Sequence, residues 1–165
     1  AVDPKFIHRY FPRPSAKRGL EYFPEGFLRT IQNRDRRLGL SELCLGVEVD
    51  GVAKAYPFRE LAKVPNGLLQ EEVAGKRILV VHELKSGTTR ALLCEQATGR
   101  LDFEVDADPD MLRETGSGSR FTRFGRAVDG PLKDLQLPLV NSLQAEWYGW
   151  YALHPETDLF SRGSP

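Results

Sequence analysis

A β-hairpin over residues 45–57 constrains the fold more than any other stretch of this chain. Two β-prone runs flank Asp50-Gly51, a dipeptide that fits a two-residue type I′ turn because both central residues need a positive φ. With Val49 paired to Val52, the bulky face of the hairpin holds Leu45, Val47, Val49, Val52 and Tyr56. The opposite face holds only small side chains, those of Cys44, Gly46, Ala53 and Ala55, so a second layer can approach it closely. Pro57 cannot donate to a ladder, so we expect the strand to end there and a helical turn to follow over residues 58–62.

Length and composition are those of one soluble globular domain. The 165 residues are 41% hydrophobic and 28% charged, which is ordinary for such a domain. No apolar run approaches the roughly 18 residues that a membrane-spanning helix needs, so we expect no transmembrane segment. The net charge is zero, but residues 1–38 carry +5 and residues 39–165 carry −5. A basic N-terminal region of this kind either folds back on the acidic body or reaches a partner.

The first 24 residues read as an arm rather than as part of the domain. They combine four prolines with five aromatic residues. Prolines at this density prevent regular structure, whereas aromatic side chains need a surface on which to bury themselves. We therefore expect an extended arm over residues 1–24, packed on the body or on another protein, and a single domain over residues 25–165. The candidate binding residues of the arm are Phe6, Tyr10, Phe11, Tyr22 and Phe23.

Two amphipathic helices are expected at the ends of the domain. The first, the front helix, covers residues 24–38, with Phe27, Ile31 and Leu38 on one stripe and Gly39 as its stop. The second covers residues 142–153, where Asn141 and Gln144 resemble a capping box. Its expected stripe consists of Leu143, Trp147, Trp150 and His154.

Between the helices the pattern favours β-structure. Residues 77–82 are a continuous apolar run and predict a strand that is buried on both faces. Turns at residues 85–88 and 98–99 lead into strands over residues 90–96 and 100–106, which would complete a three-strand meander. A short helical turn over residues 108–113 and a Gly/Ser-rich loop over residues 115–131 follow. The fold class is thus α+β: an antiparallel or mixed sheet of about six strands built from hairpins, with an N-terminal helix and a C-terminal Trp-bearing helix.

Arginine alternates with phenylalanine over residues 120–126. Such a segment can stack nucleobases, but it is also typical of a loop whose rings enter the core while the arginines extend along its edge. The neutral chain as a whole gives no support to a nucleic-acid ligand, so we expect none.

No catalytic constellation stands out. The chain has no Gly-x-Ser-x-Gly elbow, no phosphate-binding loop and no His-Glu-x-x-His motif. Cys44 and Cys94 lie fifty positions apart, and we favour two buried free thiols over a disulfide. We expect no catalytic residue and no cofactor. If any residues bind a metal, they are His82, Glu83, Cys94 and His154, although no ligand spacing supports such a site.

Three motifs in order carry a family resemblance. They are the hairpin of residues 45–57, Gly130-Pro-Leu132, and the Trp147-x-x-Trp150-x-x-x-His-Pro-x-Thr157 segment. Together they cover roughly residues 40–160, and the chain resembles the bacterial domain-of-unknown-function family 3179. The resemblance implies a mainly β domain, often extracytoplasmic, whose biochemical role is undetermined.

The chain departs from this family pattern in three segments. Residues 66–71 replace a His-Glu-x-x-Asn-Asp segment, and residues 121–123 replace a Trp-Ser-Gln segment. Residues 82–87 replace Tyr-Cys-Pro-x-Cys-Gly, which puts Glu83 and Ser86 at the positions of the two cysteines. Metal or redox chemistry that depends on paired thiols should therefore be missing here. His82, Glu83 and Ser86 are candidate binding residues of a replacement site.

These observations lead to one hypothesis and two alternatives. We expect a non-catalytic accessory protein, periplasmic or otherwise extracytoplasmic, that docks on another protein or on a second copy through the arm and the front helix. The first alternative is a metal-binding or redox protein that uses His82, Glu83, Cys94 and His154. The second is an enzyme of unknown reaction.

Overall fold

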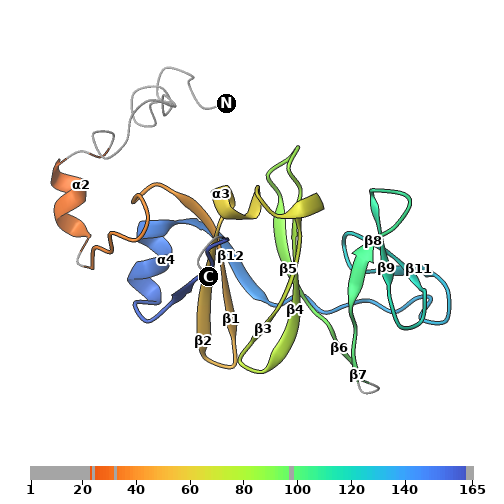
Figure 1. Ribbon diagram of the computed structural model, residues 1–165. Helices are drawn as coiled ribbons and strands as arrows, with labels where there is room; N and C mark the ends of the chain where they lie inside the picture. Colours follow the sequence, from red (N-terminus) through yellow and green to blue (C-terminus); the bar gives the residue numbers. More distant parts are fainter. Residues whose placement is uncertain (1–22, 24, 32, 97–98, 163–165) are drawn as a thin grey trace, which may run out of the picture.

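The computed structural model describes residues 23, 25–31, 33–96 and 99–162 (Figure 1). The chain is an α+β protein made mainly of antiparallel strands, with short helices. The helices are α2 (Glu25–Thr30), α3 (Phe58–Leu61) and α4 (Trp147–Leu153), with a 3₁₀ turn at Pro65–Gly67. None of the helices in the described part of the chain has the length and apolar character needed to cross a membrane.

The described strands form four sheets. The first, of order β12-β1-β2-β13, contains β1 (Leu43–Val49), β2 (Val52–Pro57), β12 (Asn141–Glu146) and β13 (Asp158–Leu159). The second, of order β3-β4-β5, contains β3 (Leu68–Val73), β4 (Lys76–His82) and β5 (Thr89–Leu93). The third, of order β11-β10-β9-β8, contains β8 (Phe103–Val105), β9 (Met111–Glu114), β10 (Arg120–Thr122) and β11 (Ala127–Asp129). A two-stranded ribbon of β6 (Glu95–Gln96) and β7 (Gly99–Arg100) joins the second sheet to the third.

The hairpin of β1 and β2 has the predicted turn and register. Val49 pairs with Val52, and Asp50 and Gly51 have φ values of 48° and 81°. Both values are positive, as a type I′ turn requires. The small face of the hairpin packs on α4, where Trp147 and Trp150 cover Cys44 and Ala55. Strand β2 ends at Pro57 and α3 begins at the next residue, as expected.

Strand β4 lies at the centre of the fold and is buried on both faces, as its apolar run predicts. Ile78 and Val80 belong to the core between the first and second sheets. Leu79 and Val81 belong to the core between the second and third sheets, with Phe121. The layers therefore follow one another as α4, the β1–β2 sheet, the β3–β4–β5 sheet and the β8–β11 sheet (Figure 1).

The front helix is shorter than predicted, because α2 ends at Thr30 rather than near residue 38. Beyond it, Arg37 donates from its Nη1 to the carbonyl oxygen of Thr157 over 3.0 Å. Leu38 enters the core beneath Trp147 and Trp150. These two tertiary contacts hold Arg37 and Leu38 in place beyond the end of α2.

The C-terminal helix is also shorter than predicted. Residues 141–146 form β12, which pairs along β1 from Leu43↔Glu146 to Glu48↔Asn141, and α4 begins at Trp147. Without β12, this edge of β1 would be left without ladder partners, and an open edge is unfavourable. Leu143 consequently lies on a strand with 52% of its surface exposed, apart from the buried Trp147 and Trp150.

The predicted meander is wrong in its third strand. The strand beside β4 opposite β5 is β3, which turns into β4 through Ala74-Gly75, with φ values of 50° and 76°. After β7 the chain leaves that sheet, and β8 pairs with β9 instead. Residues 111–114 are thus a strand rather than the end of a helical turn, and the expected loop over residues 115–131 contains β10 and β11. Alanine carries no signal for a positive φ, so the β3–β4 turn was not recognisable.

Candidate functional site

A cavity of about 560 Å³ opens beside the turn that joins β4 to β5. We call it the hairpin cavity. Its polar lining consists mainly of Glu83, Ser86, Thr88, Arg90, Thr122 and Arg123. The turn contributes Glu83, Ser86 and Thr88, β5 contributes Arg90, and the end of β10 and the turn after it contribute Thr122 and Arg123. Its volume lies within the range typical of ligand pockets.

Two largely buried guanidinium groups dominate the electrostatics of this cavity. The side chains of Arg90 and Arg123 are each only 11% exposed. Both face the same oxygen, Oε1 of Glu83, at 4.0 Å and 3.8 Å. Arg123 is fixed by its Nε, which donates to the carbonyl oxygen of Pro109, and by both Nη atoms, which donate to the carbonyl oxygen of Asn66, all at 3.1 Å. One carboxylate thus faces two cations without a direct hydrogen bond to either.

Arg90 is positioned but has donors to spare. Its Nη1 donates to the carbonyl oxygen of Arg123 over 3.0 Å, and its guanidinium lies 3.9 Å from the centre of the Phe124 ring. Burial lowers the pKa of Arg90, an effect that Glu83 opposes and Arg123 reinforces. The group nevertheless stays charged, because an arginine does not deprotonate in proteins. A guanidinium has five N–H donors, and Arg90 uses one of them in a hydrogen bond within the described part of the chain.

The hydroxyl groups of the turn satisfy one another. Ser86 Oγ donates to Thr88 Oγ1 over 3.0 Å and accepts from the Thr88 backbone N–H over 3.2 Å. A serine nucleophile needs a base within hydrogen-bond reach, whereas this hydroxyl is bonded to another hydroxyl. The chemistry suited to this lining is the binding of an anionic group.

His82 belongs to the core rather than to the cavity. It is 6% exposed, its Nδ1 lies 2.7 Å from Thr89 Oγ1, and its ring packs on Phe58 with 5.3 Å between centroids. Burial lowers its pKa, against the opposing charge of Glu83. The structure therefore brings Glu83 and Ser86 together at the cavity and buries the His82 side chain in the core.

The four residues suggested for a metal do not form one site. Cys94 pairs its backbone N–H with the carbonyl of Arg77, which lies about 17 Å along β4 from His82 at the usual rise of a strand. His154 stacks on Trp150 with 3.9 Å between ring centroids, in the separate core around α4. In the described ranges, no three His, Cys, Asp or Glu residues lie close enough to hold a metal ion.

Both cysteines are free and buried, as predicted. They lie in different cores, Cys44 against α4 and Cys94 between the second and third sheets. Burial raises the pKa of each thiol to about 12. Neither thiol therefore has the low pKa and the access of a reactive cysteine.

Of the aromatic residues proposed for the arm, Phe6, Tyr10, Phe11 and Tyr22 lie outside the described residues. Phe23 is described, and its ring stacks on Phe27 of α2 at 5.1 Å. Both rings meet the edge or face of Tyr148 on α4, at 5.7 Å and 5.4 Å. These contacts attach α2 to α4 through aromatic side chains.

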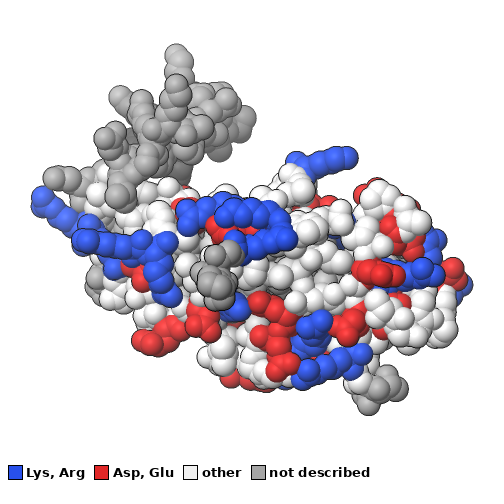
Figure 2. All heavy atoms as spheres, in the orientation of Figure 1, with Lys and Arg blue, Asp and Glu red and all other residues white. Residues whose placement is uncertain are grey.

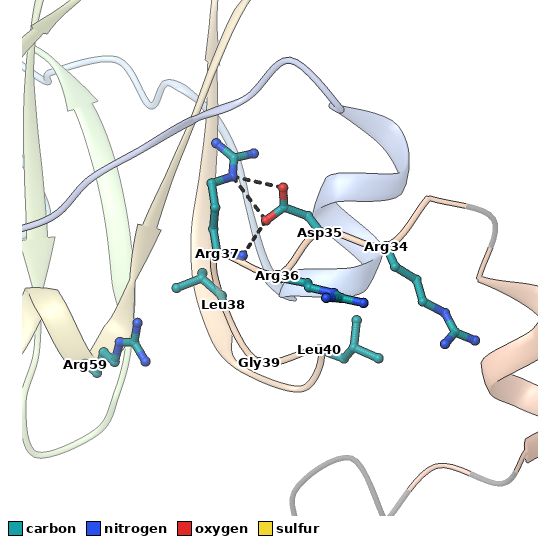
Figure 3. A pocket seen from close by; sticks show the side chains of 8 residues that line it. All are labelled: Arg34, Asp35, Arg36, Arg37, Leu38, Gly39, Leu40 and Arg59. Carbon is teal, nitrogen blue, oxygen red and sulfur yellow. Dashed lines mark hydrogen bonds and ion pairs between the residues drawn. The ribbon is translucent and has the colours of Figure 1, made fainter.

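A second cavity, of about 710 Å³, lies along the segment between α2 and β1 (Figure 3). We call it the arginine pocket. Its lining includes four arginines and one acid: Arg34, Arg36, Arg37, Arg59 and Asp35. Leu38 and Leu40, 6% and 7% exposed, provide an apolar floor.

The four arginines of this pocket differ in how they are held. Arg37 is bound to Asp35, 3.0 Å from Nε to Oδ2, and Arg59 lies 2.9 Å from Glu42 Oε1. Arg34 donates to the carbonyl oxygen of Leu28. Arg36 is exposed and has no ion pair with any residue in the described ranges. Figure 3 shows Arg34 and Arg36 extending away from the Arg37–Asp35 pair. These two are the cations most available to a partner.

The three segments that depart from the expected motifs meet at the hairpin cavity. The segment of residues 82–87 contributes Glu83 and Ser86 to its lining, and residues 121–123 contribute Thr122 and Arg123. Residues 66–71 supply the Asn66 carbonyl to which Arg123 donates. A family model described as Protein of unknown function (DUF3179) matches residues 10–157. The chain belongs to this family. The match confirms the resemblance, but the DUF3179 description assigns no activity. No curated protein and no solved structure matches the chain.

Sequence reasoning missed Arg90, Arg123 and Phe124. The segment of alternating arginine and phenylalanine over residues 120–126 was the sequence feature that could have indicated them. We expected both of its rings to enter the core, and only one does. Phe121 enters the core with no exposed surface, whereas Phe124 is 66% exposed and lies under Arg90. Nothing near Arg90 in the sequence indicates that it meets Arg123, because the two residues approach only when the second and third sheets pack together.

Proposed function

We propose that the protein is a non-catalytic, extracytoplasmic accessory protein that docks on another protein through a front surface made of α2 and the arginine pocket, together with the arm of residues 1–24. The observation that carries this proposal is the arginine pocket, in which four arginines and one aspartate surround an apolar floor. Arginine combined with buried apolar surface is typical of residues that dominate protein interfaces. The extracytoplasmic location rests on the resemblance to family members outside the cytoplasm.

The charge of the front surface argues for an acidic partner segment. In Figure 2, Lys and Arg side chains gather on the side of the molecule where α2 and α3 lie. Residues 1–24 of this chain carry a net charge of +3, so like charge disfavours their binding in the arginine pocket. An acidic segment of another protein would be attracted by both the arm and the pocket, which steers association and fixes its orientation.

The experiment compares partner capture by matched variants of the full chain. The test variant is Arg34→Gln with Arg36→Gln, two exposed positions. The control is Arg113→Gln with Arg126→Gln, two exposed arginines of the third sheet region. Each protein is immobilised and exposed to a native extracytoplasmic extract, and captured proteins are identified by mass spectrometry. A protein retained by the wild type is then purified and its affinity measured for each variant.

We expect the purified partner to bind the wild type and the control equally, and to bind the test variant about tenfold more weakly or worse. Binding should also fall steeply with added salt, because exposed charges are screened. Equal affinity for all three proteins would contradict the proposal. Sedimentation of the protein alone is the second readout: salt-sensitive dimers lost in the test variant would show that the acidic body of a second copy occupies the front surface, which would refute docking on a different protein.

A further inference from the structure

We propose that the hairpin cavity binds a carboxylate group of a peptide, which Arg90 and Arg123 hold above the β4–β5 turn. This inference is separate from the proposed function, because the hairpin cavity and the arginine pocket share no lining residue. It rests on the two guanidinium groups, on the charges around them and on the apolar rim of the cavity.

The guanidinium pair is built into the fold rather than displayed on the surface. Three hydrogen bonds to the backbone carbonyls of Pro109 and Asn66 fix Arg123. The carbonyl of Arg123 and the ring of Phe124 fix Arg90. Such a prepositioned pair has little side-chain freedom left to lose on binding, so more of the interaction energy appears as affinity. A planar carboxylate can accept two parallel hydrogen bonds from a guanidinium, which is the strongest pairing available to it.

The charges that face the pair select a monoanion. Glu83 neutralises one of the two guanidinium groups, since its Oε1 is shared between them at about 4 Å. Asp110 also lines the cavity and is exposed. Because Asp110 is exposed, solvent and salt screen its charge, so one positive charge remains at the pair beside Glu83. A single carboxylate compensates that charge, whereas a doubly charged anion such as phosphate exceeds it. The hydroxyl of Thr122 lies in the same lining and can donate to the second oxygen of the ligand.

The rim of the cavity suits an apolar side chain next to that carboxylate. Phe124 lines the cavity and is 66% exposed, and Met111 in the same lining is half-buried. Large apolar side chains that are exposed beside a polar cavity mark contact sites for a ligand or partner. A peptide with an aromatic or aliphatic residue beside its carboxylate would bury this rim and pair with the guanidinium groups at once.

The test uses three peptides and the full, unmodified chain, with affinities measured by isothermal titration calorimetry. The peptides are N-acetyl-Gly-Phe with a free carboxylate, the same peptide as its C-terminal amide, and N-acetyl-Asp-Phe amide, which carries its carboxylate on a side chain. We expect the free-carboxylate peptide to bind at least about tenfold tighter than the plain amide, as expected for one charge-assisted pairing. Comparable binding of the Asp peptide would assign the site to acidic side chains as well as chain ends. If neither acidic peptide exceeds the plain amide, the proposal is wrong.

Variants then locate the site. Arg90→Gln should abolish the preference for the carboxylate, and Arg90→Lys should restore part of it through charge alone. Arg113→Gln, on the exposed face of β9, is the matched control and should keep the full preference. Circular dichroism verifies that each variant is folded. A carboxylate preference that survives in folded Arg90→Gln would place the site elsewhere and overturn the inference.

Discussion

A Cβ atom at Gly46 would lie 2.1 Å from Cε3 of Trp150. The indole ring therefore occupies the space that a side chain on β1 would need. Cys44, Ala55 and Leu38 complete the surface against which Trp147 and Trp150 pack. The glycine of the hairpin and the tryptophan of α4 are thus two parts of one contact, which holds the first sheet to its covering helix.

The contact predicts that Gly46→Ala destabilises the protein. The added methyl group must displace a buried aromatic ring, so we expect the free energy of unfolding to fall by about 1–3 kcal/mol. Urea denaturation followed by tryptophan fluorescence measures this. The control is Gly149→Ala in α4, where a Cβ meets nothing within 4 Å and the helix should gain up to about 1 kcal/mol. Equal stability of the two variants would contradict the packing described.

Thr157 should contribute to stability through one hydrogen bond. Trp150 donates from Nε1 to Thr157 Oγ1 over 3.0 Å, and both residues are buried, at 3% and 2% exposure. Thr157→Val keeps the shape but leaves the indole N–H without an acceptor, so we expect a loss of about 1–3 kcal/mol. Thr157→Ser retains the hydroxyl and should lose less. Thermal unfolding of the wild type and the two variants compares their stabilities. A Thr157→Val variant as stable as the wild type would show that the hydrogen bond does not contribute.

The two thiols should be inert in the native protein. Burial raises the pKa of Cys44 and of Cys94 to about 12, so at pH 8 almost no thiolate is present, and the reagent has no access to it. Iodoacetamide should add nothing to the folded chain and two groups to the chain in guanidinium chloride, as read by intact mass. Rapid labelling of the native protein, or a mass that lacks two hydrogens, would refute this.

Glu114 should make stability depend on pH in the acid range. Burial opposes its ionisation, but hydrogen bonds from Ser117 and from the backbone N–H of Gly116 outweigh burial and hold its pKa below the usual value. With the native pKa below that of the unfolded chain, about 4.3, the stabilisation is complete above that pH and is lost as the pH falls through the native pKa. Unfolding free energies measured between pH 7 and pH 3 should fall in the wild type, and fall less in Glu114→Gln. If the unfolding free energies of the two proteins fall equally with pH, Glu114 does not have this role.

Local patterns predicted those parts of the fold that depend on local energies. The Asp50-Gly51 turn, the register of Val49 with Val52 and the end of β2 at Pro57 all follow from backbone preferences of single residues. The continuous apolar run of β4 likewise indicates burial on both faces. Of the candidate site, Glu83 and Ser86 were found from the sequence, because they stand where the family pattern has other residues.

The remaining features arise from contacts between segments far apart in the chain. Residues 141–146 have a sequence that suits a helix, yet they form β12 because the free edge of β1 offers six paired positions. Residues 33–38 are not helical, and Leu38 is buried beneath the tryptophans instead.

The sequence by itself determined the hairpin, the buried central strand and the small face that receives α4, since each depends on the φ preference or the size of neighbouring residues. Only the tertiary structure decided which strands share a sheet, and that Arg90 meets Arg123 beside Glu83. The reason is physical: strand pairing and the convergence of charges are set by the free energy of closing one segment on another, and that quantity is not encoded in either segment alone.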